Sequence, residues 1–220
     1  MVQHWDSDEE LAVLRSITSD LAEGISIHWV PGNHDVAPDT FCPTPEGLQR
    51  YHEAFGPNRY VSETGDVHLI VINSTSIHSP DHVPAERAAN LEFMEAEFAE
   101  ADRREQTPIV CSQHPWFLAP GHSAAALAMP EEPAGQLMDI ASGGGLRTLL
   151  SDHIHGNDLD ARGQLQQLTT TTTGLTFRDA PSGFRLPEGA SRNVRTQNME
   201  IDWIGAVPTT MQSSPRMRTA

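Results

Sequence analysis

Side chains able to bind a metal ion concentrate in three short segments of the sequence. The segments are Gly32-Asn33-His34-Asp35, Gln113-His114-Pro115 and His153-Ile154-His155. Neutral imidazoles together with amide and carboxylate oxygens suit zinc, manganese and iron. In an extended segment, the two histidines of the last group would project to the same side of the backbone. A pair at that spacing can serve one ion or two adjacent ions.

Each of these segments follows a run that predicts a buried strand. The runs are residues 25–30, which are apolar with β-branched members, residues 107–112 and the short run 146–151. In α/β proteins, ligands bind beyond the carboxyl ends of the strands. We therefore expect the three segments to meet at one edge of a sheet.

The remaining pattern alternates helices and strands, which predicts an α/β fold. Residues 7–23 predict a helix capped by Ser7, with Leu11, Leu14, Ile17 and Leu21 on one apolar face. The other predicted elements are helices at 45–55 and 84–104, a hairpin of 60–62 with 67–73, a strand at 164–173 and a strand that begins at Gly183.

Two regions give no clear periodicity. Residues 118–145 are rich in Ala, Pro and Gly and could be a mobile loop over the site or a partly disordered segment. In either case, we expect this region to shape specificity. Residues 187–220 are mostly polar and lack hydrophobic periodicity. They predict an irregular or disordered tail after a domain of residues 1–186.

The charge of the chain restricts its partners. A formal net charge of −16 argues against nucleic acid or an anionic membrane, because both are bound mainly by Lys and Arg. Metal ions could still supply the positive charge that phosphate requires. Two cysteines outside any CxxC pair, an acidic N-terminus and no apolar run of 18 residues lead us to expect a cytoplasmic protein with no membrane partner.

The three segments, in this order and each after a strand, resemble the last three sequence blocks of the calcineurin-like metallophosphoesterase superfamily. The matching stretches are residues 30–36, 113–115 and 153–157, within a region of similarity that covers about 1–186. The resemblance implies a β-sandwich with flanking helices, two divalent metal ions (Mn, Fe or Zn) and hydrolysis of phosphoric esters. It implies a phosphorylated small molecule or a phosphoprotein as the substrate.

The resemblance also implies a role for each matching residue. Asn33, His114 and His153 would bind the second metal, and His155 would bind the first. His34 would act as the acid at the leaving oxygen, and Asp35 would hold the His34 ring by a hydrogen bond.

The sequence departs from the family pattern in three places. The Asp-x-His and Gly-Asp blocks, which carry further metal ligands, do not occur ahead of Asn33, so we expect an N-terminally truncated domain. That expectation implies impaired activity, with one metal or none bound. Asp152 stands where the family usually has Gly, and the family's later sheet strands are not evident after Arg185.

Simpler interpretations compete with the metal site. Asn33 and Asp35 are common turn residues, and each His-bearing loop taken alone would be an ordinary surface loop. The order of all three blocks favours the phosphoesterase interpretation, with a catalytically inactive binding protein or a truncated fragment as the alternative. Arg178 and Arg185 could contact phosphate but read better as surface residues, and the histidines that match no block are expected to be structural or exposed: His28, His52, His68, His78 and His122.

Overall fold

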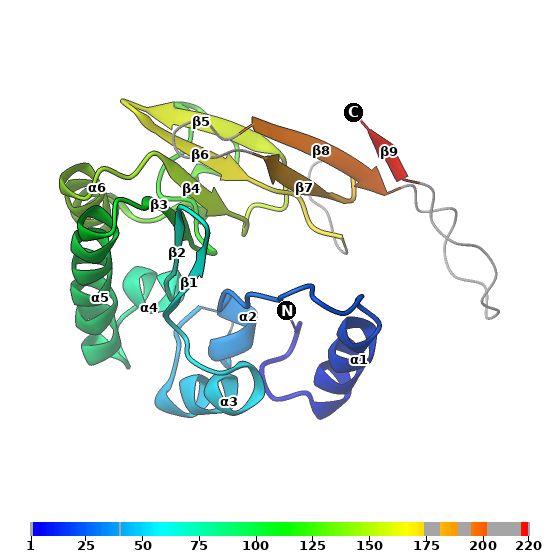
Figure 1. The fold of residues 1–220 in the computed structure, drawn as a ribbon. Helices are drawn as coiled ribbons and strands as arrows, with labels where there is room; N and C mark the ends of the chain where they lie inside the picture. The colour runs from blue at the N-terminus through cyan, green and yellow to red at the C-terminus, as the bar shows by residue number, and fades with distance from the viewer. Residues whose placement is uncertain (1, 40, 174–180, 189–194, 202–216, 220) are drawn as a thin grey trace.

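A six-stranded sheet forms the centre of the molecule (Figure 1). The computed structural model describes residues 2–39, 41–173, 181–188, 195–201 and 217–219. The strand order is β1-β2-β3-β4-β6-β5. The bounds are β1 (Tyr60–Thr64), β2 (Val67–Val71), β3 (Thr107–Cys111), β4 (Thr148–Ser151), β5 (Asp158–Arg162) and β6 (Leu165–Thr169).

The four inner strands run parallel, and the two edge strands are antiparallel to their neighbours. The register pairs Val71 with Cys111, Cys111 with Leu150, and Leu150 with Leu168. The carboxyl ends of β2, β3, β4 and β6 therefore reach the same edge of the sheet. The predicted α/β class and the predicted hairpin are confirmed.

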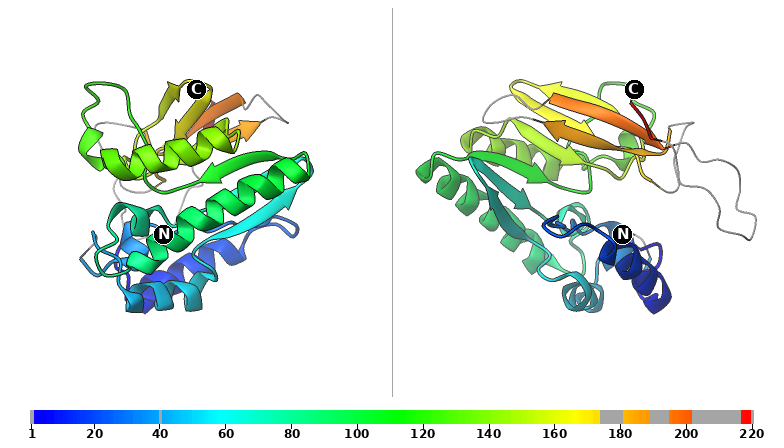
Figure 2. Two further views of the ribbon diagram at one scale, coloured as in Figure 1. Left: turned by 90° about the vertical axis from the view of Figure 1, so that its left-hand side faces the viewer. Right: turned by 45° about the vertical axis from the view of Figure 1, so that its right-hand side comes forward.

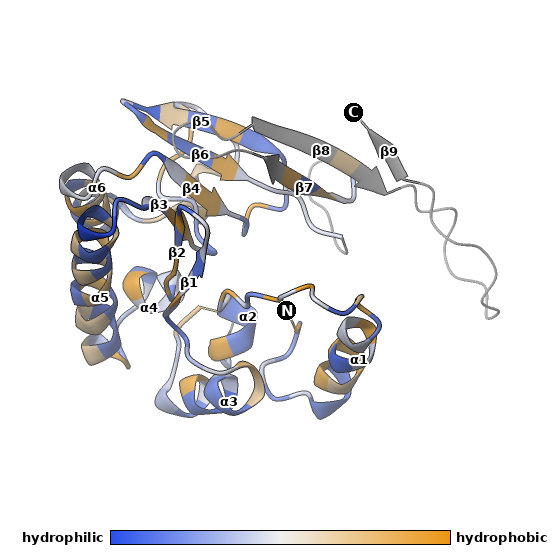
Figure 3. Ribbon diagram, in the orientation of Figure 1, coloured by the Kyte–Doolittle hydropathy of each residue, from blue (hydrophilic) through white to orange (hydrophobic). Residues whose placement is uncertain are grey.

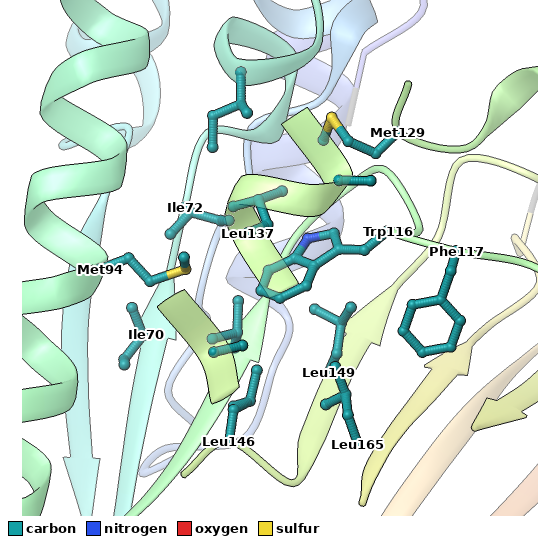
Figure 4. Close-up of a cluster of buried hydrophobic side chains, with 14 of the residues drawn as sticks. Ile70, Ile72, Met94, Trp116, Phe117, Met129, Leu137, Leu146, Leu149 and Leu165 are labelled. Atoms are coloured by element: carbon teal, nitrogen blue, oxygen red, sulfur yellow. The ribbon is translucent and has the colours of Figure 1, made fainter. Parts of the chain in front are cut away.

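Two helices cover one face of this sheet. They are α5 (Pro84–Arg103) and α6 (Glu131–Gly143), which lie in front of the strands in the left view of Figure 2. The main core fills the space between them and the sheet, with Trp116, Met94 and Leu137 nearly or fully buried (Figure 4). The core residues also include Ile70, Ile72, Phe98, Val110, Phe117, Met129, Leu146, Leu149 and Leu165.

Helix α6 lies inside the segment for which the sequence suggested a loop or disorder. Its Ala, Pro and Gly residues obscure the pattern, but Pro133 falls in the first turn, where proline is tolerated. Leu137 and Ala141 sit four residues apart on one face and are buried in the core. Packing therefore holds a helix that local composition did not favour, and the loop interpretation of residues 131–143 was wrong.

The predictions for the N-terminal region were partly wrong. Helix α1 (Asp8–Ser19) begins as expected, since the Ser7 side chain accepts a hydrogen bond from the Glu10 N–H. It contains no buried residue, although its ribbon includes hydrophobic positions (Figure 3), and it lies apart from the sheet (Figure 1). Residues 25–30 form no strand, and Ile25 is 58% exposed. β1 contacts this run through a side chain, because the Tyr60 hydroxyl donates to the Trp29 carbonyl oxygen, but no backbone hydrogen bond pairs the run with a described strand, so its β propensity is not realised.

A smaller helical layer carries the first histidine-bearing segment. It consists of α2 (Asn33–Val36) and α3 (Pro45–Phe55). The Thr44 side chain caps α3 by accepting a hydrogen bond from the Gly47 N–H. Gly47 packs against α2 so closely that a Cβ there would lie 2.1 Å from the Val36 carbonyl oxygen. Close packing of backbone on backbone thus fixes α2 relative to α3.

The remaining elements include a short helix at the end of β2, α4 (Ser74–His78), and a 3-10 turn (Ala125–Leu127). A second sheet contains β7 (Gly183–Glu188), β8 (Arg195–Ile201) and β9 (Met217–Thr219). Two of these strands lie in the segment expected to be irregular, and the division of the chain at residue 186 stays a prediction. No helix in the described part of the chain has the length and apolar character needed to cross a membrane.

Candidate metal centre

A cavity of about 270 Å³ opens where the carboxyl ends of β3 and β4 approach α2 and α4. It is lined by residues from each of the three predicted segments, so the structure brings those segments together. The lining residues are Asn33, His34, Phe41, His78, Gln113, His114, Ala126, Leu127, His153 and His155.

Three imidazole rings cluster in this cavity. The ring centroids of His114 and His153 are 4.3 Å apart, and the planes are tilted by 46°. The His78 ring stacks on the His114 ring, with the centroids 4.6 Å apart and the planes at 22°. His78 matched no sequence block and was expected to be structural or exposed, whereas the structure places it against His114, a predicted metal ligand.

Burial keeps these rings uncharged. Desolvation is the main cause that lowers the pKa of His114 well below its usual range, with repulsion from His153 and His78 adding to it. Desolvation likewise lowers the pKa of His153 to about 4, and it lowers the pKa of His78. Neutral imidazoles have a free nitrogen lone pair at neutral pH, as metal ligation requires.

The fully buried Ser74 fixes the His114 ring. Ser74 Oγ accepts a hydrogen bond from the His114 backbone N–H at 3.0 Å and lies 3.1 Å from Nδ1 of the same residue. If Nδ1–H donates to Oγ, then Nε2 carries the lone pair. Sequence reasoning missed Ser74, although its position directly after the strand of the hairpin was a usable signal.

Gln113 ties the α2 loop to the loop after β3. Its Oε1 accepts from the Asn33 backbone N–H at 2.9 Å and from Thr75 Oγ1 at 3.2 Å. Its Nε2 donates to Asn33 Oδ1. An amide oxygen has a second lone pair, so Asn33 Oδ1 can still face an ion. The sequence placed Gln113 in a block but assigned it no role.

His34 and Asp35 are held by the backbone around α2. Nδ1–H of His34 donates to the Gln3 carbonyl oxygen at 2.9 Å. Nε2 is then the ring nitrogen that can take part in a reaction at the cavity, which His34 lines. The Asp35 carboxylate is buried and accepts from the N–H groups of Gly32 and Val2. The predicted hydrogen bond between Asp35 and His34 stays a prediction.

The loop after β4 is not extended at its two histidines. His153 and His155 have φ values of 63° and 49°, which place both in the left-handed region. Non-glycine residues occupy that region at a cost, and such strain is concentrated at functional sites. Contacts with Thr171 hold the loop: its N–H donates to Asn157 Oδ1, and its Oγ1 donates to the His155 carbonyl oxygen.

Asp152 opens this loop with a buried carboxylate. Its backbone N–H donates to the Gln113 carbonyl oxygen at 3.0 Å, and its side chain accepts from the His153 N–H. The second carboxylate oxygen, Oδ1, is buried and has no hydrogen-bond partner. Burial is the main cause that raises the pKa of this carboxyl group.

The donor set fits divalent cations by its chemistry. Uncharged rings of His114 and His153 and the Asn33 oxygen from a second element face one cavity, and an orphaned carboxylate oxygen lies in the loop that carries His155. Among the described residues, no three His, Cys, Asp or Glu side chains are already arranged to hold an ion. The fit is therefore one of ligand type and proximity.

Outside the cavity, two of the remaining histidines are bonded to acidic groups. His68 is buried and lies 3.0 Å from both Glu97 Oε2 and Gln106 Oε1, which agrees with a structural role. His122 Nε2 lies 3.3 Å from Asp158 Oδ1. Arg185 lies on β7, and Arg178 lies outside the described residues.

Comparison with known proteins gives low identities over most of the chain. No protein-family model matches it. The serine/threonine-protein phosphatase CPPED1 of Bos taurus is 24% identical over 192 residues, which cover 86% of this chain and 59% of the bovine protein. The Homo sapiens protein of that name is 22% identical over 181 residues, covering 81% and 57%. The chain thus spans somewhat more than half the length of these relatives.

A solved structure with a similar fold supports the comparison with these relatives. GAP50, the anchor in the inner membrane complex of Plasmodium, has a TM-score of 0.56 at 12% identity, covering 65% of this chain and 50% of GAP50. CPPED1 and GAP50 have the calcineurin-like metallophosphoesterase fold. This chain has that fold too. The mixed sheet and flanking helices of the metallophosphoesterase fold account for the meeting of the three segments at one sheet edge.

Proposed function

We propose that this chain carries the site of a metal-dependent hydrolase of phosphoric esters. The observation that carries the proposal is the meeting of Asn33, His114 and His153, from three separate loops, at one cavity with uncharged rings. The phosphatase names of the curated relatives support a phosphoester substrate. A phosphomonoester, on a phosphoprotein or a phosphorylated small molecule, is the substrate class we assign.

The ligands divide into two groups. Asn33, His114 and His153 would hold one divalent ion, and His155 would contribute to a second. Nitrogen and oxygen donors of this kind favour Mn, Fe or Zn. When bound, such a pair of ions lowers the pKa of water and neutralises charge on the phosphoryl oxygens.

His34 is suited to handle the proton at the leaving group. Its Nδ1–H is engaged by the Gln3 carbonyl oxygen, so the ring is oriented and Nε2 is the nitrogen that exchanges a proton. A protonated Nε2 can donate to the departing oxygen, which general acid catalysis requires. Asp35, buried beside it, would support the ring and anchor the turn of α2.

Metal content and turnover of one set of variants test the proposal. The chain, purified with Mn²⁺ or Zn²⁺, is expected to bind an ion and to hydrolyse an aryl phosphate, and His153→Ala should reduce both at least about tenfold. His52→Ala changes an exposed histidine of α3 that does not line the cavity, and it should leave both unchanged. Equal loss in both variants, or hydrolysis without bound metal, would contradict the proposal.

A catalytically inactive metal-binding protein is the second candidate. It is favoured by the lack of a ready group of three charged or imidazole ligands among the described residues, since catalytic sites usually have three protein ligands to an ion. Slow turnover by this 220-residue polypeptide follows for the same reason. Metal binding with no hydrolysis would select this candidate, and non-cooperative unfolding without metal binding would select a fragment.

A further inference from the structure

We propose that the cavity selects phosphomonoesters whose leaving group is an aromatic ring, with the ring held by Phe41 and Leu127. The inference rests on the proposed function and narrows its substrate class. In the reaction, water replaces the aryl oxygen on phosphorus and the departing oxygen takes a proton, so the products are inorganic phosphate and a phenol.

The first support is that two exposed hydrophobic side chains line the cavity that holds the histidines. Phe41 is 71% exposed and Leu127 is 37% exposed, and Ala126 lines the cavity beside Leu127. Large apolar side chains left in water beside a polar site are typical of ligand-binding grooves. A cavity lined partly by histidines and partly by apolar groups fits a ligand that is phosphorylated at one end and apolar at the other.

The Phe41 side of the cavity is held by hydrogen bonds to the backbone. Asp39 Oδ1 accepts from the Phe41 N–H at 2.9 Å and from the next N–H along the chain at 2.8 Å. The Thr44 N–H donates to the Val36 carbonyl oxygen at 3.3 Å, which ties this segment to the end of α2. Because α2 also carries His34, the proposed acid and the ring-binding side chain belong to connected parts of the cavity wall.

The Leu127 side of the cavity is held on both sides of the 3-10 turn. Before the turn, the Ala124 N–H donates to His122 Nδ1 at 3.1 Å. After it, the Met129 N–H donates to the Pro115 carbonyl oxygen at 2.8 Å. Ala124 and Met129 are buried, so the turn is anchored while Leu127 stays exposed. The turn lies in the Ala-, Pro- and Gly-rich segment that was expected to shape specificity.

The size of the cavity limits the ligand. Its volume of about 270 Å³ lies just below the range of roughly 300–1,000 Å³ that is usual for small-molecule sites. A phosphoryl group with one ring suits a site of this size better than a nucleotide does. An aromatic ring would remove the apolar side chains from water and pair with the Phe41 ring, whereas a short alkyl group would leave much of that surface exposed.

Binding of two non-hydrolysable analogues tests the preference. Phenylphosphonate and methylphosphonate share the anionic group, and only the first carries a ring. In isothermal titration of the Mn²⁺-loaded chain, Phe41→Ala should weaken phenylphosphonate binding about 3- to 10-fold and methylphosphonate binding less than about twofold. Phe41→Leu, which keeps an apolar side chain, should give an intermediate loss. Leu159→Ala is the control, because Leu159 is 63% exposed and does not line the cavity, and it should leave both affinities unchanged.

Turnover separates a failure of this inference from a failure of the proposed function. Aryl phosphates are intrinsically more reactive than alkyl phosphates, so the readout is the change in a ratio. Phe41→Ala should lower the ratio of kcat/KM for phosphotyrosine to that for phosphoserine about 3- to 10-fold, with metal content unchanged. Equal effects on the ring-bearing and ring-free compounds would overturn the inference and leave the proposed function standing. If the unchanged chain neither binds the phosphonates nor hydrolyses either substrate, both are overturned.

Discussion

Ser74 Oγ lies 3.1 Å from His114 Nδ1 and also accepts the backbone N–H of the same histidine. A single buried hydroxyl thus fixes both the ring and the backbone of a proposed metal ligand. Residues that orient a metal-bound histidine contribute strongly to affinity, because they set its tautomer and direction.

Replacement of this hydroxyl should weaken metal binding. Ser74→Ala is expected to reduce affinity for Zn²⁺ about 10- to 100-fold and to destabilise the fold by about 1–3 kcal/mol, since two buried donors or acceptors lose their partner. Ser74→Thr, which keeps the hydroxyl, should retain more of the affinity. Isothermal titration and urea unfolding measure the two effects. Equal affinity for the Ala and Thr variants would show that the hydroxyl does not orient the ring.

Acid should destabilise the metal-free protein through His153. Its folded-state pKa is about 4 and its ordinary value is 6.5, so the unfolded chain takes up a proton in this window that the folded chain does not. Stability is fully present above pH 6.5 and falls as the pH drops toward 4, by roughly 1–3 kcal/mol from this group after allowance for its partial exposure. Urea unfolding from pH 7.5 to 4.5 measures the loss. His153→Asn should show a shallower fall, and an unchanged slope would contradict the assignment.

The close packing of α3 on α2 gives a stability prediction. Gly47→Ala places a Cβ 2.1 Å from the Val36 carbonyl oxygen, so one helix must shift. The expected loss is about 1–3 kcal/mol, with weaker metal binding because Asn33 moves with α2. Gly135→Ala is the control, because no atom lies within 4 Å of its Cβ position in α6. It should stabilise by about 0.5–1 kcal/mol. Thermal and urea unfolding measure both effects. Equal changes in the free energy of unfolding for Gly47→Ala and Gly135→Ala would refute the prediction.

Core packing around α6 gives a further prediction. Leu137 is fully buried between α6 and the sheet, so Leu137→Ala should cost about 2–5 kcal/mol through lost contacts and a cavity. Leu159→Ala removes a side chain that is 63% exposed on β5 and should cost less than about 0.5 kcal/mol. Urea unfolding compares them. Similar small losses would mean that α6 is not held by the core.

The sequence predicted the elements whose signals are local. The Ser7 cap and the hairpin turn at Gly65 depend on a few neighbouring residues, and the structure confirms them. Helix α6 was missed because its apolar residues are few and its stability comes from the core. Residues 25–30 were wrongly assigned to a strand because their apolar, β-branched composition favours one. Composition does not show whether a neighbouring strand is placed to pair with the run, and here no described strand is.

In the site too, the features encoded in the sequence blocks were predicted, and those that depend on three-dimensional contacts were missed. The order of the blocks predicted that His114 and His153 would approach each other, and the parallel strands explain why they do. The supporting residues were missed. Ser74 and His78 belong to a short helix after β2 whose importance depends on its three-dimensional contact with the loop after β3. Sequence spacing alone does not encode that contact.

The left-handed backbone at His153 and His155 means that selection for stability and selection for metal binding favour different residues at these positions. Glycine or asparagine would occupy those angles with less strain, so a library of variants screened only for thermal tolerance should drift away from histidine at both positions. A library screened for metal retention should keep both histidines. The distribution of residues recovered at these two positions would therefore report whether this loop has been preserved for folding or for chemistry.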